Sequence, residues 1–150
     1  MFNKGWSTWL PFYYYKMENI EKYIGIYYGW KSKYRMTCLD LCRQWYIDHG
    51  YKQNFDDGKI YPKSMDEFNK SHRFRLMKYL LRNFTVTKDS KNLNHGDIVA
   101  FNINGDMHFG IYLENDTVLA MQVPCIEGVS QSTVYKRKFW NNAFVCGFKR

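Results

Sequence analysis

Cys38 is a candidate nucleophile because of where it falls in the sequence. Thr37 precedes it and Asp40 follows two residues later, so Thr37-Cys38-Leu39-Asp40 is a variant of the capping box that opens a helix. A cysteine in the first turn of a helix meets unpaired backbone N–H groups and the positive end of the helix dipole, and both lower the pKa of a thiol. Spacing alone favours the alternative, a small buried apolar residue, so a second feature must decide between the two.

His108 is the candidate base, and its place in a strand predicts its partner. Apolar residues occupy the odd-numbered positions of 107–113, so His108 points to the opposite face of the predicted strand. The three-residue loop 114–116 sets the register of the next strand and places Gln122 directly across from His108, on the face away from the core.

Together these residues fit a cysteine–histidine pair with an orienting third group. An imidazole takes the proton of the thiol, while an amide bound to its other ring nitrogen fixes the ring. We therefore predict Cys38 as nucleophile, His108 as base and Gln122 as the residue that orients the imidazole. Taken singly, a strand histidine or glutamine is more often a bystander, so the prediction depends on the combination.

Two helices with recognisable N-terminal caps are expected to precede the histidine strand. One runs from Cys38 to a C-cap at Gly50, and its apolar face includes Cys42, which favours core packing over a second reactive thiol for that residue. Ser64-Met65-Asp66-Glu67 is a full capping box that opens a second helix ending near Asn83.

From Leu93 onward the hydrophobic period changes to two, which is typical of strands. The predicted strands cover residues 98–102, 107–113, 117–123, 133–140 and 143–148, the last two as a closing pair. Helices followed by an antiparallel meander indicate an α+β fold in one domain.

Composition limits the classes of function. The 150 residues suffice for one domain with a real core, and a net charge of +8 suggests a negatively charged partner. The Lys and Arg residues are scattered rather than clustered, which disfavours nucleic acid. Four cysteines without a C-x-x-C pair, and histidines outside zinc-finger spacing, argue against structural zinc, and we expect reduced thiols.

Residues 1–16 are rich in aromatic side chains and suggest an arm that lies on the domain or on a neighbouring subunit. A short helix is expected next, over Met17–Ile26. The N-terminus has neither the apolar region nor the cleavage site of a secretory signal, and no apolar run is long enough to span a bilayer. A role outside the cell would therefore need another route of delivery.

The pattern around these candidates resembles the NlpC-type cell-wall cysteine peptidases over roughly residues 20–150. The residues that carry the resemblance are Tyr27 or Tyr28, Cys38 at a helix start, Asn94-His95-Gly96-Asp97 before an apolar strand, and His108-Phe109-Gly110-Ile111-Tyr112. The end of the chain, with Ser130, Tyr135, Trp140 and Arg150, is more similar to the branch found in bacteriophage tail-tip proteins.

This resemblance implies a papain-like α+β fold, with residues 17–150 as one peptidase-like domain that cleaves peptide stems of peptidoglycan without a cofactor or metal. It implies Cys38 and His108 as the catalytic pair, with Tyr27 or Tyr28 near the oxyanion. In the bacteriophage branch, the protein would belong to the virion tail and act at the host cell wall. Its arm at residues 1–16 would contact other tail-tip or hub proteins.

Two departures from the family pattern leave an alternative open. Thr37-Cys38-Leu39-Asp40 replaces the usual Asp-Cys motif, and Ala120 aligns with the family's third catalytic residue but cannot orient an imidazole. Gln122 lies two residues later on the same face and is predicted to substitute. The alternative is a catalytically weakened structural subunit of the tail hub or baseplate on the same scaffold. A basic nucleic-acid-binding protein is a third and less favoured interpretation.

Overall fold

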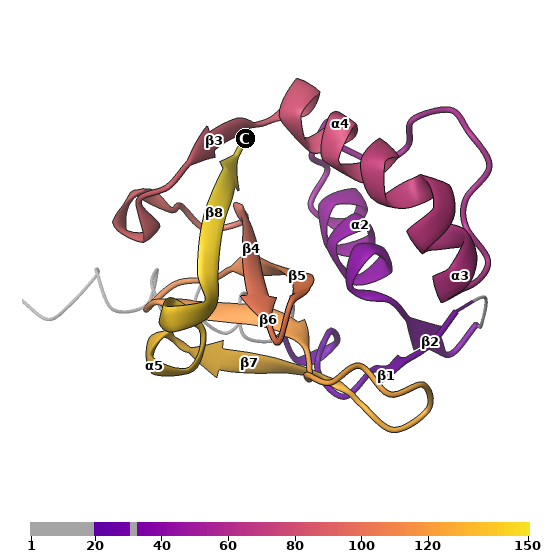
Figure 1. Ribbon diagram of the computed structural model, residues 1–150. Coiled ribbons are helices and arrows are strands. Elements are labelled where there is room, and N and C mark those ends of the chain that lie inside the picture. The colour runs from indigo at the N-terminus through magenta and orange to yellow at the C-terminus, as the bar shows by residue number, and fades with distance from the viewer. Residues whose placement is uncertain (1–19, 31–32) are drawn as a thin grey trace, which may run out of the picture.

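The computed structural model describes residues 20–30 and 33–150, and Figure 1 shows a group of helices beside a sheet. The expected arm at residues 1–16 lies outside the described residues, as does the first part of the expected helix Met17–Ile26. Ile20 and Glu21 are helical, and the chain then turns at Gly25, whose φ is +80°. No helix of the described part of the chain is long and apolar enough to cross a membrane.

Six antiparallel strands form the main sheet in the order β3-β8-β4-β5-β6-β7. Their bounds are β3 Thr85–Thr87, β4 Ile98–Ile103, β5 Asp106–Tyr112, β6 Thr117–Met121, β7 Ser132–Lys136 and β8 Phe144–Lys149. Strands β4 to β7 pair consecutively, which confirms the predicted meander. Two short strands, β1 (Tyr27–Tyr28) and β2 (Arg35–Met36), form a separate parallel pair that the sequence did not predict.

Helix α2 (Cys38–Asp48) begins at the predicted capping box. Thr37 Oγ1 accepts a hydrogen bond from the Asp40 backbone N–H at 3.1 Å, and Asp40 Oδ2 accepts one from the Thr37 backbone N–H at 2.9 Å. Gly50 follows the helix with φ of +69°, a left-handed conformation that suits glycine beyond a helix end. The cap makes Cys38 the first residue of α2.

The second predicted helix is present as one continuous helical segment with an irregular middle. It consists of α3 (Met65–Glu67), the π-helical η1 (Phe68–His72) and α4 (Arg73–Asn83). Ser64 Oγ accepts from the Glu67 backbone N–H at 3.2 Å, whereas the Glu67 carboxylate accepts from the Lys63 backbone N–H. Only one of the two hydrogen bonds of the predicted capping box is therefore formed, the one that Ser64 accepts.

The main core lies between these helices and one face of the sheet. Its largest fully buried side chains on the helical side include Trp45, Tyr46, Leu41 and Leu80. Cys42 is also buried in this cluster, which confirms its predicted role in packing. Because α2 is anchored through this face, its first residue is held at a fixed place beside β5.

The predicted closing pair of strands is wrong. The predicted strand 133–140 ends at Lys136, and α5 (Arg137–Trp140) follows, leading through the short 3₁₀ turn η3 (Asn141–Ala143) into β8. β7 pairs with β6 at one edge of the sheet, while β8 crosses over to lie between β3 and β4. A strand pattern does not reveal this because Trp140 is buried by the turn of α5 over the sheet.

The sheet face away from the helices is also apolar and buried, whereas we expected a non-core face. Val99, Phe101, Val118, Ala120 and Trp140 form a second cluster there. A Cβ at Gly110 would come within 2.6 Å of a Val118 methyl carbon, so β5 and β6 pack too closely for any other residue at that position. Ala120 is therefore part of a packed layer.

Candidate functional site

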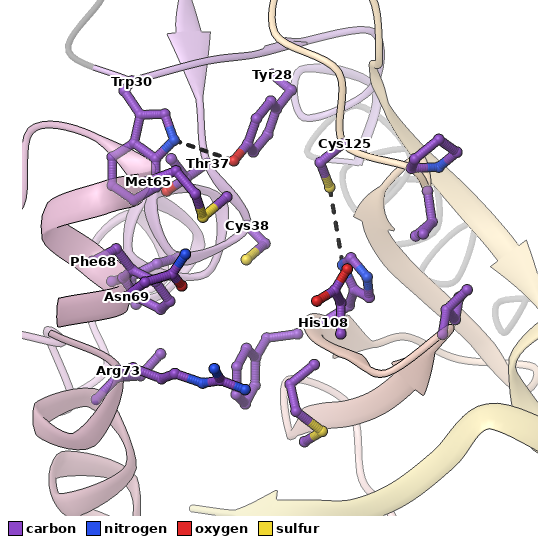
Figure 2. Close-up of a pocket in the computed structure, with 18 of the residues that line it drawn as sticks. Tyr28, Trp30, Thr37, Cys38, Met65, Phe68, Asn69, Arg73, His108 and Cys125 are labelled. Atoms are coloured by element: carbon purple, nitrogen blue, oxygen red, sulfur yellow. Dashed lines mark hydrogen bonds between the residues drawn. The ribbon is translucent and has the colours of Figure 1, made fainter.

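A cavity of about 570 Å³ opens between the helices and the start of β5. Figure 2 shows Cys38 on the helical side of this cavity and His108 with Cys125 on the opposite side. The remaining lining is mostly apolar: Tyr28, Trp30, Leu39, Met65, Phe68, Leu76, Met77, Ile103, Met107, Phe109, Val123 and Pro124. The structure thus brings the predicted nucleophile and base to one cavity.

Cys38 stands at the N-terminus of α2 with a partly buried side chain. Burial raises the pKa of its thiol to about 12, and the neighbouring Cys125 adds to the rise, although the backbone N–H groups of Phe109 and Leu39 act in the opposite direction. Contrary to the expectation from the sequence, the helix start does not generate a thiolate by itself, because desolvation outweighs the hydrogen-bond donors. Cys38 is a neutral thiol at neutral pH and needs a base.

His108 lies in β5, with its ring stacked on Phe101 at 5.8 Å between ring centroids. Burial lowers the pKa of the imidazole, and the charge of Asp106 opposes that shift only in part. The ring is therefore neutral at neutral pH and able to accept a proton.

The described hydrogen-bond partner of the His108 ring is Cys125, a residue that the sequence analysis missed. Cys125 Sγ lies 3.9 Å from His108 Nδ1, and its thiol donates to the Gln122 backbone carbonyl at 3.4 Å. Burial raises the pKa of the Cys125 thiol to about 11, with a smaller contribution from Asp106. No sequence motif marks Cys125, since it lies in the loop between β6 and β7.

This loop is held in place on both sides. Ser130 Oγ accepts from the Ile126 backbone N–H at 2.8 Å and donates to the Pro124 carbonyl at 2.6 Å. The Tyr28 N–H donates to the Ser130 carbonyl, and the Gly128 N–H donates to the Tyr28 carbonyl. Cys125 is thus positioned by a network that also fixes Tyr28.

Gln122 is not brought to the imidazole. The Gly110–Ala120 pairing, extended by two residues, sets Gln122 opposite His108 as predicted, but β6 ends at Met121. The Gln122 side-chain oxygen accepts from the Gln131 backbone N–H at 3.0 Å, which ties the ends of the loop together. The register prediction is sound, while the predicted contact is absent because the amide has a nearer partner.

The two candidate tyrosines differ in burial and in their position relative to the cavity. Tyr28 is 5% exposed and lines the cavity, and its hydroxyl accepts a hydrogen bond from the Trp30 indole at 3.2 Å. Burial raises the pKa of Tyr28 to about 12, so the hydroxyl keeps its proton. Tyr27 is 45% exposed and does not line the cavity. Only Tyr28 is placed to donate toward a group bound at Cys38.

No group of three or more His, Cys, Asp or Glu side chains in residues 20–30 and 33–150 has the arrangement of a metal site. All four cysteines are free thiols in the structure. The cavity lining carries thiol, imidazole and hydroxyl groups together with the side chains of Asn69, Arg73 and Asp106.

Comparison with known proteins bears on the scaffold that carries these residues. The sequence pattern of the NlpC/P60 family matches residues 25–149. A solved structure of the NlpC/p60 domain of peptidoglycan hydrolase SagA has a TM-score of 0.51 and 16% sequence identity, covering 89% of this chain and 95% of that chain. No curated protein matches this sequence. The structural likeness confirms the expected papain-like scaffold.

Proposed function

This chain belongs to the NlpC/P60 family, and from that premise we propose that it is a cysteine peptidase that cleaves the peptide stems of peptidoglycan. Cys38 is the nucleophile and His108 is the base. The observation that carries the proposal is the placement of both side chains on facing walls of one cavity, with Cys38 at a capped helix start. The solved relative is named as a peptidoglycan hydrolase, which supports the substrate class.

The protonation states define the first step. Because Cys38 and His108 are both neutral at neutral pH, the thiol proton passes to the imidazole as the sulfur attacks the scissile carbonyl. In the resting state the imidazole is next to Cys125, and a 3.9 Å contact to sulfur is weak enough to be exchanged for Cys38 when substrate enters.

The negative charge on the carbonyl oxygen needs donors. Backbone N–H groups at the start of α2 are unpaired within the helix, and the Tyr28 hydroxyl faces the same cavity. The protonated His108 then gives its proton to the leaving amine, and water hydrolyses the thioester on Cys38. This sequence regenerates thiol and imidazole without a cofactor.

A digest of purified peptidoglycan tests the proposal. The wild-type protein should release peptide fragments that mass spectrometry detects, and Cys38→Ala should release none. Cys42→Ala is a matched control because Cys42 lies one turn along the same helix but is buried in the core. Equal amounts of product from wild type and Cys38→Ala would refute the proposal.

A structural role on the same scaffold is the second candidate. Three observations favour it: the His108 ring contacts Cys125, the Gln122 amide is engaged with Gln131, and burial raises the pKa of Cys38. If this role is correct, Cys38 reacts with iodoacetamide at the same rate in wild type and His108→Ala at every pH. A rate that depends on His108 would exclude it.

For the setting of this activity, we propose the tail of a bacteriophage, acting at the host cell wall. The support is the sequence pattern of the last segment, residues 129–150, and the net charge of +8, which suits an anionic envelope. Residues 1–16 would dock on another tail-tip or hub protein. Mass spectrometry of purified virions of a phage that encodes this chain should detect it in the tail fraction, and its absence there would refute this setting.

A further inference from the structure

One continuous helical segment forms the wall of the cavity that faces His108. It contributes six lining residues: Met65, Phe68, Asn69, Arg73, Leu76 and Met77. Asn69 and Arg73 are the polar members of this set. Figure 2 shows the Arg73 side chain extending from the helix into the cavity below Cys38, with Asn69 one turn earlier on the same wall.

Two other cations of this helical segment have carboxylate partners. Lys70 pairs with Asp66 at 2.9 Å, and Arg75 pairs with Asp57 at 2.7 Å. Within the described residues, no ion pair or hydrogen bond engages the Arg73 guanidinium. The acid that lines the cavity, Asp106, lies on the opposite wall in β5.

Asn69 and Arg73 are four residues apart, a spacing that places two side chains on the same face of a helix. Asn69 lies within η1, and Arg73 is the first residue of α4. A π-helical turn holds more residues per turn than an α-helix, so it shifts the face that the following residues present. Such turns occur often at functional sites. The guanidinium of Arg73 and the amide of Asn69 both line the same cavity.

We propose that Arg73 and Asn69 form a carboxylate subsite that selects peptides carrying a free carboxylate close to the scissile bond. A guanidinium binds a carboxylate through two parallel hydrogen bonds, and the Asn69 amide adds a further N–H donor. The apolar residues Phe68, Leu76 and Phe109 line the same cavity beside these two exposed polar side chains. The inference rests on the proposed peptidase function and specifies its substrate.

A pair of synthetic peptides tests the subsite. The two are identical except that one has a free carboxylate on the residue beside the cleaved bond and the other a carboxamide. The wild-type protein should cleave the carboxylate form with a kcat/KM about tenfold to a hundredfold higher, mostly through KM. Arg73→Gln should reduce this ratio to about one.

Lys78→Gln is the matched control, since Lys78 is an exposed cation of α4 outside the cavity lining. It should keep the wild-type ratio. A wild-type ratio near one would overturn the subsite, and so would an equal loss on both peptides in Arg73→Gln.

Binding separates failure of the subsite from failure of the peptidase. Calorimetry with Cys38→Ala should show tighter binding of the carboxylate peptide, and adding Arg73→Gln should remove the difference. If wild type cleaves neither peptide while this binding difference holds, the peptidase proposal fails and the carboxylate subsite stands. If Cys38→Ala binds both peptides equally or binds neither, the subsite fails.

Discussion

The two walls of the cavity are built in different ways. On the helical wall, Cys38 occupies the first residue of a capped helix whose buried face, which includes Cys42 and Trp45, packs into the main core. On the sheet wall, His108 stands near the beginning of β5 and faces Cys125 on a loop. The nucleophile is fixed by local sequence, whereas the surroundings of the base come from a distant segment. Variants on each wall should therefore fail in different ways.

The largest effect is expected on the helical wall. Cys38→Ala removes the attacking sulfur and should lower kcat on a peptide substrate by about 10⁴-fold or more, in the range seen for other nucleophile deletions. Cys42→Ala should retain wild-type kcat while lowering the free energy of unfolding by about 1 kcal/mol, because it shortens a buried side chain. Steady-state kinetics and urea unfolding measure the two outcomes. Comparable losses of kcat in both variants would contradict the assignment of Cys38 as nucleophile and Cys42 as a core residue.

His108→Gln is the corresponding change on the sheet wall. It removes the group that accepts the Cys38 proton, and kcat should fall by about 10²- to 10⁴-fold. His49→Gln serves as control, since His49 lies at the far end of α2 and stacks on Trp45. A kcat for His108→Gln within a factor of about three of wild type would show that His108 is not the base.

Cys125→Ala should have a much smaller effect than either change. If the Cys125 thiol only contacts the His108 imidazole before substrate binds, kcat/KM of Cys125→Ala should stay within about threefold of wild type. The same kinetic assay measures it, with Cys146→Ala as control because Cys146 lies in β8 and does not line the cavity. A loss of kcat/KM as large as that of Cys38→Ala would indicate that Cys125, on the sheet wall, takes part in catalysis as the nucleophile.

The pH dependence should show the smallest change. Burial lowers the pKa of His108, so the neutral base persists below the usual range and the acid limb of kcat/KM should lie below the ordinary histidine pKa. Asp106 favours the charged imidazole, so Asp106→Asn lowers the pKa further and should move the acid limb to lower pH by less than about one unit. Asp66→Asn is the control, since Asp66 lies in α3 and does not line the cavity. It should leave the pH profile unchanged. A shift to higher pH in Asp106→Asn would contradict the assignment.

The features that sequence predicted are those with short-range causes. The capping box of Thr37 and Asp40 sets the start of α2, and loop parity sets the register of β5 against β6. Both depend on residues within a few positions of one another, so spacing reveals them.

The features that sequence missed depend on distant packing. β8 crosses the sheet to lie beside β4, and the burial of Trp140 ends β7 early. Cys125 reaches His108 because the loop after β6 folds back onto Tyr28 through backbone hydrogen bonds that no side-chain pattern encodes. The burial that raises the pKa of Cys38 likewise comes from the tertiary environment, and it outweighs the local helix start.

The identity of the acylated residue tests the central claim most directly. After rapid acid quench of turnover on a peptide substrate, digestion and mass spectrometry locate any thioester. We predict that the acyl group is on Cys38 and that His108→Gln reduces the rate at which it accumulates. An acyl group on Cys125, or no thioester on either cysteine while product forms, would contradict the assignment of Cys38 as nucleophile.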